Sequence, residues 1–460
     1  MRSNYVAQIA TVILPTLLFP DHVSALTYNS QQEDTIKAAA SKQAYAMMSW
    51  YHGNETGQTP GAFEFSWWEG AALCNAMLNY WHFTGDDTYN DELSLALQWQ
   101  GGDNGDYLNA NFSQYAGNDD QMQWGAAAMT AAEYKLPDRS SGYSWLSLVQ
   151  GVYNNQKDNT EGWDPSSCGG GFRWQKTPFQ GTGYNLKNAV SNGGFMMLAA
   201  RLANYLNESS YADWAEKTWE WSLSVKLVNN QTWDVGDSVD GSESCKTVDQ
   251  TQWTYNYGVY MMGCAHMYAY SNDTKWLTAL NGLLDKLWST FFLAKYGDAI
   301  AEITCEGSDT CDRNGMLFKG LTVMWLSNIA LIVPSTYDTI LAKIQSSAVG
   351  AASTCTGEGN GTCGVRWWGS YDGQSGMEPD ISATNVFSVA MLPFVNQSEA
   401  KPATQSTGGN STSDPTAGTA DDDSKTTTPI SSGDRAGAGI LTVALVGGVV
   451  GMAVFMLMGQ

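Results

Sequence analysis

Residues 119–134 read Asp-Asp-Gln-Met-Gln-Trp-Gly-Ala-Ala-Ala-Met-Thr-Ala-Ala-Glu-Tyr, a polar start followed by a mostly apolar helical stretch. A helix that is apolar on all sides is buried in the core of a protein. Five other segments share the pattern, with small residues that let helices approach closely: 68–83, 187–206, 253–270, 315–332 and 381–394. These segments recur roughly every 50–75 residues, which is longer than most short solenoid repeats. They predict six buried helices.

More amphipathic helices, which carry charges, are predicted between the buried ones, at 32–51, 89–99, 211–226 and 273–291. Buried helices that alternate with amphipathic ones in a single domain predict an all-α fold, an (α/α)6 toroid (barrel) of six inner and six outer helices. An elongated α-solenoid is the alternative. The long connections at 162–184 and 357–377, rich in Gly and Trp, favour the toroid because they are suited to line a cleft.

Both ends of the chain have the composition of processing signals. Residues 1–25 contain a short apolar run and end in Val23-Ser24-Ala25, which predicts a signal peptide; the run is shorter than the roughly 20 residues of a membrane span. Residues 26–396 form the predicted domain. A Ser/Thr-rich disordered stalk at 397–432 and an apolar tail at 433–460 predict a glycosylphosphatidylinositol (GPI) anchor, attached at Ser431, with a true C-terminal span as the alternative.

The composition fits a protein of the extracellular face of the plasma membrane. The net charge of −23 excludes nucleic acid as a partner, and 19 Trp and 22 Tyr provide flat faces suited to sugar rings. Few residues are charged, 15%, so glycans are expected to contribute to solubility. Eight Asn-x-Ser/Thr acceptors predict N-glycosylation, at Asn54, Asn111, Asn207, Asn230, Asn272, Asn360, Asn396 and Asn410.

The eight cysteines of an exported chain predict disulfides rather than metal ligands. Cys305 with Cys311 and Cys355 with Cys363 are close enough in sequence for local loop disulfides. Cys74 and Cys264 lie in apolar helical segments, so they are either buried thiols or a disulfide. Only four histidines are present, and we expect no metal site and no cofactor.

Asp119 and Asp120 begin one of the predicted inner helices, for which Asn118 is the expected N-cap and Gln121 its capping-box partner. Acidic residues in a first turn stabilise any helix through its dipole, which is one interpretation. The other is catalysis: glycoside cleavage needs two carboxyl groups, and neighbouring residues, about 3.8 Å apart at Cα, can reach the roughly 5–5.5 Å carboxyl separation of a retaining enzyme. Two close carboxylates also separate their pKa values, leaving one ionised and one protonated.

Three motifs, in order along the chain, resemble glycoside hydrolase family 76. Gly-Asn-Asp-Asp-Gln-Met-Gln-Trp-Gly at 117–125 is similar to its Asp-Asp signature, and Cys-Gly-Gly-Gly-Phe-Arg-Trp at 168–174 to its Gly-Gly-Gly loop. Trp-Thr-Tyr-Asn-Tyr-Gly at 253–258 resembles a third motif, with Tyr257 in place of the usual Gln. The resemblance covers about residues 36–394 and implies an (α/α)6 fold and a retaining mechanism, with Asp119 as nucleophile and Asp120 as acid/base.

With the two terminal signals, the resemblance points to the fungal cell-wall branch, endo-acting α-1,6-mannosidases. The substrate would be an α-1,6-mannose-containing glycan, unbranched mannan or a GPI-linked glycan, in cell wall biogenesis. Transglycosylation of the mannose glycan of GPI anchors onto wall glucan is the alternative to hydrolysis. A non-catalytic mannan-binding wall protein is the second alternative, and a purely structural glycoprotein the third.

Other candidate residues lie in or beside these motifs. Trp67 and Trp68 either stack on sugar or fill the core, whereas Trp174, Tyr255 and Asn256 are expected in the cleft. Four charged residues have a weaker claim, because salt bridges or an ordinary polar loop explain them equally well: Arg173, Arg366, Asp234 and Asp237.

Overall fold

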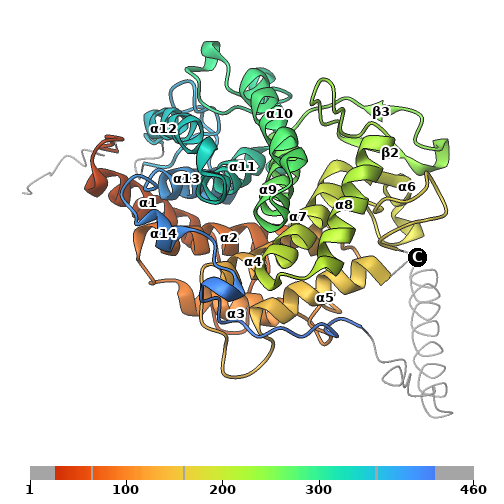
Figure 1. Cartoon of the computed structure of the whole chain (residues 1–460). Coiled ribbons are helices and arrows are strands. Elements are labelled where there is room, and N and C mark those ends of the chain that lie inside the picture. Colours follow the sequence, from red (N-terminus) through yellow and green to blue (C-terminus); the bar gives the residue numbers. More distant parts are fainter. Residues whose placement is uncertain (1–25, 64–65, 113, 159–160, 358–360, 420–460) are drawn as a thin grey trace, which may run out of the picture.

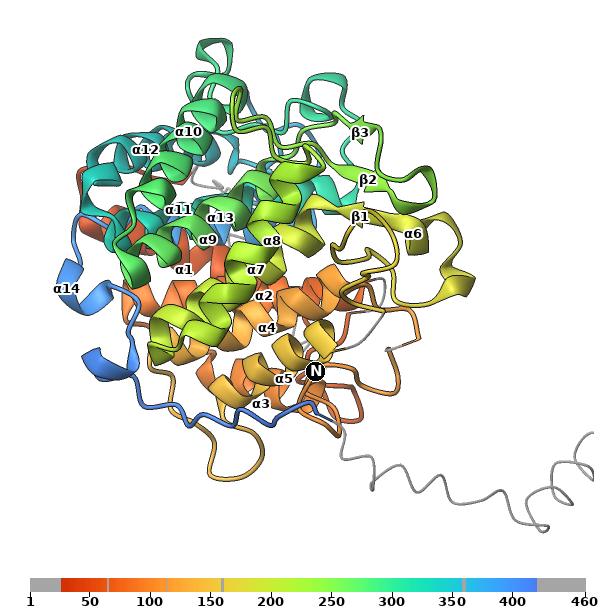
Figure 2. The same ribbon diagram turned by 45° about the vertical axis from the view of Figure 1, so that its right-hand side comes forward.

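The computed structural model describes residues 26–419 apart from 64–65, 113, 159–160 and 358–360 (Figure 1). Six helices form a closed inner ring, in which each helix contacts the next and the last contacts the first (Figure 2). These are α2 (Trp67–Thr84), α4 (Asn118–Glu133), α7 (Ala189–Leu206), α9 (Thr254–Ser271), α11 (Arg313–Ile332) and α13 (Met377–Val389). They correspond to the six predicted buried segments.

A second set of six helices surrounds the ring (Figures 1 and 2). The first precedes the first inner helix, and the other five each lie between two consecutive inner helices along the chain. These are α1 (Glu33–Ser49), α3 (Asn90–Gln100), α5 (Trp145–Asp158), α8 (Ser209–Ser224), α10 (Thr274–Phe291) and α12 (Tyr337–Thr354). The predicted (α/α)6 toroid is confirmed, and the solenoid is excluded because the ring closes.

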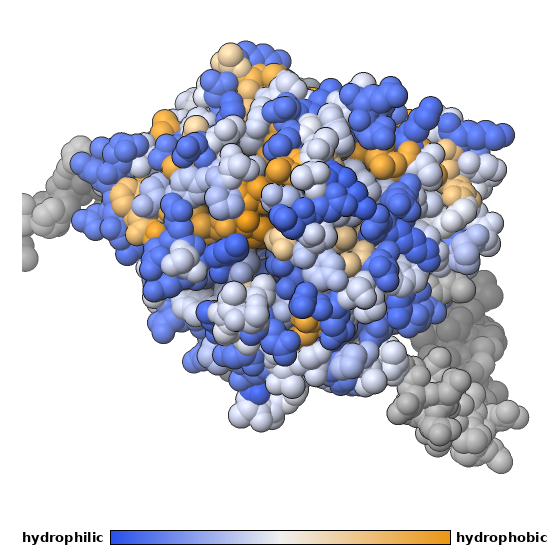
Figure 3. Space-filling model, viewed as in Figure 1, coloured by the Kyte–Doolittle hydropathy of each residue, from blue (hydrophilic) through white to orange (hydrophobic). Residues whose placement is uncertain are grey.

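The two sets of helices differ in burial as their sequences require. Helix α11 has the length and hydropathy of a membrane span, but 94% of its apolar window is buried in the ring. Helix α10 instead buries one stripe of apolar side chains, which includes Leu280, Leu283 and Leu287. On the face of the molecule seen in Figure 3, hydrophilic residues predominate around a more apolar central band.

A small antiparallel sheet, which the sequence did not reveal, lies beside the ring. Its order is β1 (Leu186–Asn188), β2 (Ser238–Asp240) and β3 (Val248–Asp249), next to the short helix α6 (Thr182–Asn185). The strands have two or three residues each, too few for the alternation of polar and apolar side chains to be recognisable. The sheet matters for function because β1 leads directly into α7.

Three disulfides are formed. Cys305–Cys311 and Cys355–Cys363 are the two predicted local pairs, and Cys168–Cys245 joins the Gly-Gly-Gly loop to the connection between β2 and β3. Cys74 in α2 and Cys264 in α9 are free, buried thiols rather than a disulfide. Burial raises the pKa of Cys74 to about 12 and raises that of Cys264 as well.

The ordered domain extends beyond residue 396, which corrects the predicted start of the disordered stalk. Residues 397–419, with the short helix α14 (Gln397–Ala400), run along the outside of α4 and α5 (Figure 2). Ser411 donates to Asp138 at 2.8 Å, and the buried Asn154 side chain donates to two backbone carbonyls of the segment at 2.9 Å. These hydrogen bonds hold a segment whose composition alone is typical of disorder. The rest of the predicted stalk, the signal peptide and the anchor signal lie outside the described residues.

Because this C-terminal segment satisfies buried polar groups, its removal should destabilise the domain. We expect a protein ending at residue 396 to unfold several degrees below one ending at residue 419, since Asp138, Gln150 and Asn154 lose their partners. Thermal unfolding followed by circular dichroism measures the difference. Equal midpoints for the two proteins would mean that the segment contributes nothing to stability.

The predicted glycosylation sites are compatible with the structure. Asn360 lies outside the described residues, and the other seven acceptor asparagines are all exposed. Asn207 and Asn272 directly follow the C-terminal ends of α7 and α9 and have positive φ, 58° and 54°, a conformation that asparagine tolerates. Use of these sites stays a prediction.

Candidate active site

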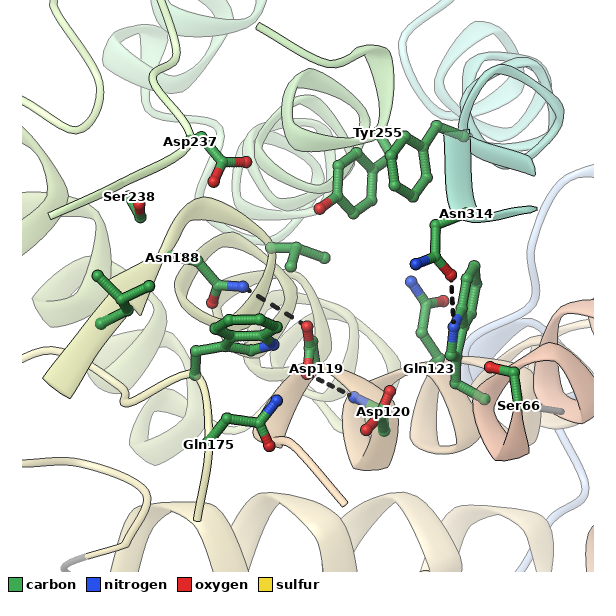
Figure 4. A pocket seen from close by; sticks show the side chains of 15 residues that line it. Ser66, Asp119, Asp120, Gln123, Gln175, Asn188, Asp237, Ser238, Tyr255 and Asn314 are labelled. Carbon is green, nitrogen blue, oxygen red and sulfur yellow. Dashed lines mark hydrogen bonds between the residues drawn. The ribbon is translucent and has the colours of Figure 1, made fainter. Parts of the chain in front are cut away.

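One cavity of about 350 Å³ opens where the N-terminal ends of the inner helices meet (Figure 4). Residues from the starts of five inner helices line it, so these helices all begin at the same end of the ring. The lining is Ser66, Trp68, Asp119, Asp120, Gln123, Trp174, Gln175, Leu186, Asn188, Val190, Asp237, Ser238, Tyr255, Asn314 and Phe318. Of the predicted site residues, the cavity brings together Asp119, Asp120, Trp68, Trp174 and Tyr255.

The start of α4 positions the two aspartates. The N-cap is Gly117, one residue earlier than predicted, and Asp120 Oδ2 accepts a 2.7 Å hydrogen bond from the Gly117 N–H. Asp119 Oδ1 accepts from the Asp120 N–H at 3.0 Å. A Cβ at position 117 would lie 2.3 Å from Asp119 Oδ1, so a larger residue there would displace the carboxylate. The aspartates therefore cap the helix and face the cavity at once.

Asn118 and Gln121 fix the helix start in another way than the predicted capping box. The Asn118 side chain donates to the carbonyls of Glu161 and Arg173 at 2.8 and 2.9 Å, and Gln121 donates to the Asp106 carbonyl at 2.7 Å. These amides tie the first turn of α4 to the loops around it. The position of Asp119 and Asp120 is thus set by buried hydrogen bonds on the side of the helix away from the cavity.

The Gly-Gly-Gly loop supports the opposite wall. The Trp174 carbonyl accepts from the Asn118 N–H at 2.8 Å, and the Trp174 N–H donates to the Leu186 carbonyl at 2.7 Å, which links α4 to β1. Gly171 has φ +92°, and a Cβ there would lie 2.2 Å from the Trp221 ring. A positive φ and so close a ring both require glycine. This backbone holds the Trp174 side chain at the cavity.

Burial raises the pKa of both aspartates, because few polar groups solvate their charged forms. The charge of Asp120 raises the pKa of Asp119 further, so that it lies well above the ordinary value. The Gly117 N–H and the Lys176 charge oppose the rise at Asp120. The pair therefore consists of two interacting carboxyl groups whose pKa values are both raised, that of Asp119 more strongly, and such a pair titrates as a unit.

Lys176, which we had not singled out from the sequence, lies behind the aspartate pair. Its side chain is 2% exposed and its ammonium donates to Asn118 Oδ1 at 2.7 Å and to Asn155 Oδ1 at 3.4 Å. Burial lowers its pKa to about 8, and the charges of Asp106, Glu161, Asp119 and Asp120 oppose this fall. A positive charge at this place favours the ionised forms of both aspartates.

We expect Lys176→Met to move the pH–activity profile to higher pH. Without the ammonium, each proton leaves the aspartate pair only at higher pH, so both the rise and the fall of activity shift in that direction. The measurement is kcat/KM against pH, with Lys176→Arg, which keeps the charge, as control. An unchanged profile in a folded Lys176→Met protein would show that the lysine acts only in packing.

Aromatic side chains form two further walls of the cavity. The Trp68 indole donates to Asn314 Oδ1 at 3.1 Å, and Tyr255 stacks on Phe318 with ring centroids 3.8 Å apart. The hydroxyl end of Tyr255 points into the cavity (Figure 4). The residue before it, Thr254, donates from its backbone and hydroxyl to the buried Glu302, whose pKa burial raises to about 8.

Asp237 and Asn188 complete the site on the side of the sheet. Asp237, one of the weaker candidates from the sequence, lines the cavity, and burial raises its pKa. Asn256 is fully buried and donates to Asp237 Oδ1 at 3.3 Å. We predicted that it would line the cavity, but it only supports the wall from behind. Asn188 Nδ2 lies 3.5 Å from Asp119 Oδ2. Asn188 and Asn314 could have been found by their place at the starts of predicted inner helices.

Two other positions lie outside the cavity. Trp67 does not line the cavity. Its indole donates to Gln100 Oε1 at 2.8 Å, and its ring packs between Phe112 and Trp124. Of the two interpretations of Trp67, packing in the core is therefore the one that the structure supports. Tyr257, expected in the cleft segment, is buried, and its hydroxyl accepts from the Val235 N–H at 3.1 Å.

Three of the weaker candidates form salt bridges outside the cavity, as their alternative interpretation held. Arg173 pairs with Asp164 at 2.9 Å, Arg366 with Asp372 at 3.4 Å, and Asp234 with Lys286 at 2.7 Å. Among the residues that the structure describes, no group of three or more His, Cys, Asp or Glu side chains could hold a metal ion.

The family model of glycosyl hydrolase family 76 matches residues 35–406 of this chain, which includes the cavity and both aspartates. The chain belongs to glycosyl hydrolase family 76. Family-76 relatives include mannan endo-1,6-alpha-mannosidase DCW1 of Saccharomyces cerevisiae, 37% identical over 94% of this chain and 95% of that protein. Another is mannan endo-1,6-alpha-mannosidase DFG5 of Candida albicans, 34% identical over 96% of this chain and 97% of that protein.

Solved family-76 structures have the same fold. Dfg5 of Chaetomium thermophilum, solved in complex with glucosamine, is 34% identical and superposes with a TM-score of 0.80 over 85% of this chain and 97% of that one. An inactive variant of an alpha-1,6-mannanase of Salegentibacter, in complex with alpha-1,6-mannotetrose, is 18% identical, with a TM-score of 0.63 over 78% and 99% of the two chains. The second likeness concerns the fold alone.

Proposed function

We propose that this family-76 enzyme is a retaining, endo-acting α-1,6-mannosidase of the cell surface. The observation that carries the proposal is the pair of adjacent carboxyl groups in a cavity walled by Trp68, Trp174 and Tyr255. Aromatic faces suit sugar rings, and two carboxyl groups supply the acid and the nucleophile of glycoside cleavage. The 37% and 34% identical relatives named as mannan endo-1,6-alpha-mannosidases support the substrate, an α-1,6-linked mannose chain.

In the proposed first step, Asp120 gives its proton to the glycosidic oxygen while Asp119 attacks the anomeric carbon. The leaving sugar departs with a hydroxyl group, and an ester joins Asp119 to the remaining mannose chain. Positive charge develops at the anomeric carbon beside Asp119, which stabilises the ionised form of this carboxyl. With sugar bound, Asp119 would therefore be ionised as the nucleophile and Asp120 protonated as the acid.

In the second step, Asp120 takes a proton from the incoming hydroxyl group, whose oxygen attacks the anomeric carbon and releases Asp119. Water as the acceptor gives hydrolysis, and a sugar hydroxyl, such as one of wall glucan, gives transglycosylation. We propose that the enzyme works at the extracellular face of the plasma membrane and in the cell wall. It would be anchored there by a GPI lipid on the carboxyl group of Ser431, which replaces the peptide bond to Ser432 and so releases the residues after 431; residues 1–25 would be removed as the signal peptide.

The test uses purified residues 26–419 with an α-1,6-linked mannose oligomer and a labelled acceptor sugar. Shortened, unlabelled products support hydrolysis and defeat the transglycosylase alternative, whereas labelled, lengthened products support transfer. No new product from the folded protein would overturn the enzyme and favour a mannan-binding wall protein. That alternative also expects Asp119→Asn or Asp120→Asn to restore function in a strain lacking the protein.

A further inference from the structure

A second and larger cavity, of about 1100 Å³, lies beside the catalytic one. It is formed by residues 50–63, which follow α1, and by the starts of α11 and α13. Its walls include Trp50, Phe63, Arg313 and Glu378. Neither the family relationship nor the aspartate pair accounts for a hollow of this size, which is in the range of ligand-binding pockets.

Both cavities have the start of α11 along one edge. In Figure 4, Asn188 and Ser238 lie on one side of the catalytic cavity and Ser66 and Asn314 on the other, with the aspartates between them. Asn314 is followed along this edge by its chain neighbour Arg313, which lines the second cavity. The hydrogen bond between Trp68 and Asn314 forms part of the boundary. A sugar chain that extends from the aspartates past Asn314 would approach the part of α11 that borders the second cavity.

The walls of the second cavity are fixed in place by ionic contacts. Arg313 pairs with Glu69 at 2.9 Å and with Glu378 at 2.5 Å, and so joins the starts of α2, α11 and α13. The Trp50 indole donates to Asp380 Oδ2 at 3.0 Å, while 44% of the residue remains exposed. An anchored indole that remains exposed is a ready-made surface for the apolar face of a sugar ring.

The charges exclude one class of ligand. Glu55, Glu69, Glu378 and Asp380 stand in or beside the cavity. They face two basic side chains that are already paired, Arg313 with Glu69 and Glu378, and His52 with Glu55. Such a surrounding repels phosphate and other anions but can accept hydrogen bonds from hydroxyl groups. With the indole, this combination suits an uncharged oligosaccharide.

We infer that the second cavity binds sugar units of the glycan that are remote from the reacting bond. The inference rests on the proposed function for the identity of the glycan. Contacts with remote units can be used to position the reacting bond, so they raise kcat/KM for long chains more than for short ones. Two chains could supply these units, the mannose substrate or a glucan acceptor, and the experiment below separates them.

The test compares Trp50→Ala with the wild type on an aryl glycoside of α-1,6-mannobiose, which fills the catalytic cavity, and on α-1,6-mannohexaose. We expect the loss of the indole to lower kcat/KM for the hexaose about tenfold more than for the short substrate. Trp50→Phe keeps a flat ring without the Asp380 hydrogen bond and should lose much less. Trp99→Ala, an equally simple loss of an exposed tryptophan on α3, is the matched control. Equal effects of Trp50→Ala on both substrates would overturn the inference.

Calorimetry keeps the inference separate from the proposed function. The doubly substituted Asp119→Asn, Asp120→Asn protein is titrated with α-1,6-mannohexaose and with a β-1,3-glucose hexamer, with and without Trp50→Ala. Weaker binding of the mannose chain on loss of Trp50 assigns the cavity to the substrate, and weaker binding of the glucose chain assigns it to the acceptor. If Trp50→Ala changes neither, the second cavity is no sugar site, even where the wild type cleaves mannan. If the wild type cleaves nothing, the proposed function fails and the binding result alone decides this inference.

Discussion

Asp119→Asn and Asp120→Asn should each lower kcat/KM on α-1,6-linked mannose oligomers by about a thousandfold or more, because each removes one of the two groups that the reaction needs. The protein should stay folded, since an asparagine oxygen at position 120 can still accept from the Gly117 N–H. Thermal unfolding checks this. Activity of either variant near that of the wild type would remove the residue from the catalytic pair.

The same two variants separate the roles. A substrate with a dinitrophenol leaving group needs no proton donor, so it should restore the first step in Asp120→Asn but not in Asp119→Asn. Added azide should give the α-mannosyl azide with Asp120→Asn, through two inversions, and the β-azide with Asp119→Asn, through one. The opposite pattern would exchange the roles of Asp119 and Asp120.

Arg201→Leu is expected to cost about 3–5 kcal/mol of unfolding free energy, the second large effect. Arg201 on α7 is 1% exposed and its guanidinium binds both oxygens of Glu133, at 2.7 and 3.2 Å. Its removal leaves a buried carboxylate without its cation. Burial already raises the pKa of Glu133, and without Arg201 it would rise further.

The sign of the pH dependence follows from this rise. Between the ordinary glutamate pKa and the higher pKa of the folded variant, the folded state binds more protons than the unfolded one, so stability falls as pH increases. The loss in Arg201→Leu should be small in acid and grow toward neutral pH. Urea unfolding at several pH values measures it, with Arg201→Leu, Glu133→Leu as the control that removes both charges. A double variant less stable than the single one would contradict this account.

The inner ring could be predicted because its helices are apolar on all sides, a property that residue order alone displays. The start of α4 was placed one residue late, since glycine at position 117 serves as the N-cap and the Asp120 carboxylate reaches back to it. Short-range patterns also missed the sheet, whose strands depend on pairing between residues 186–188 and 238–240. The ordered C-terminal segment escaped detection because its stability comes from partners such as Asp138 and Asn154, more than 250 positions away.

Site residues that belong to a sequence motif could be predicted, whereas those brought to the site only by folding could not. Asp119 and Asp120 came from chemistry and a family signature, whereas Lys176 became visible only when the chain folded behind Asn118. Trp67 and Trp68 are neighbours in sequence, yet one packs on Trp124 and the other lines the cavity. Composition cannot separate such a pair, because the direction of each side chain depends on the helix that presents it.

The two free cysteines can be used to detect opening of the helical ring. Cys74 and Cys264 sit on inner helices that are separated by two others in either direction around the ring, and neither is accessible to solvent. Their raised pKa values leave almost no thiolate at neutral pH, so a thiol reagent can modify them only when the ring opens. The rate of labelling at these two positions therefore reports how often α2 and α9, on opposite sides of the ring, separate from their neighbours under native conditions.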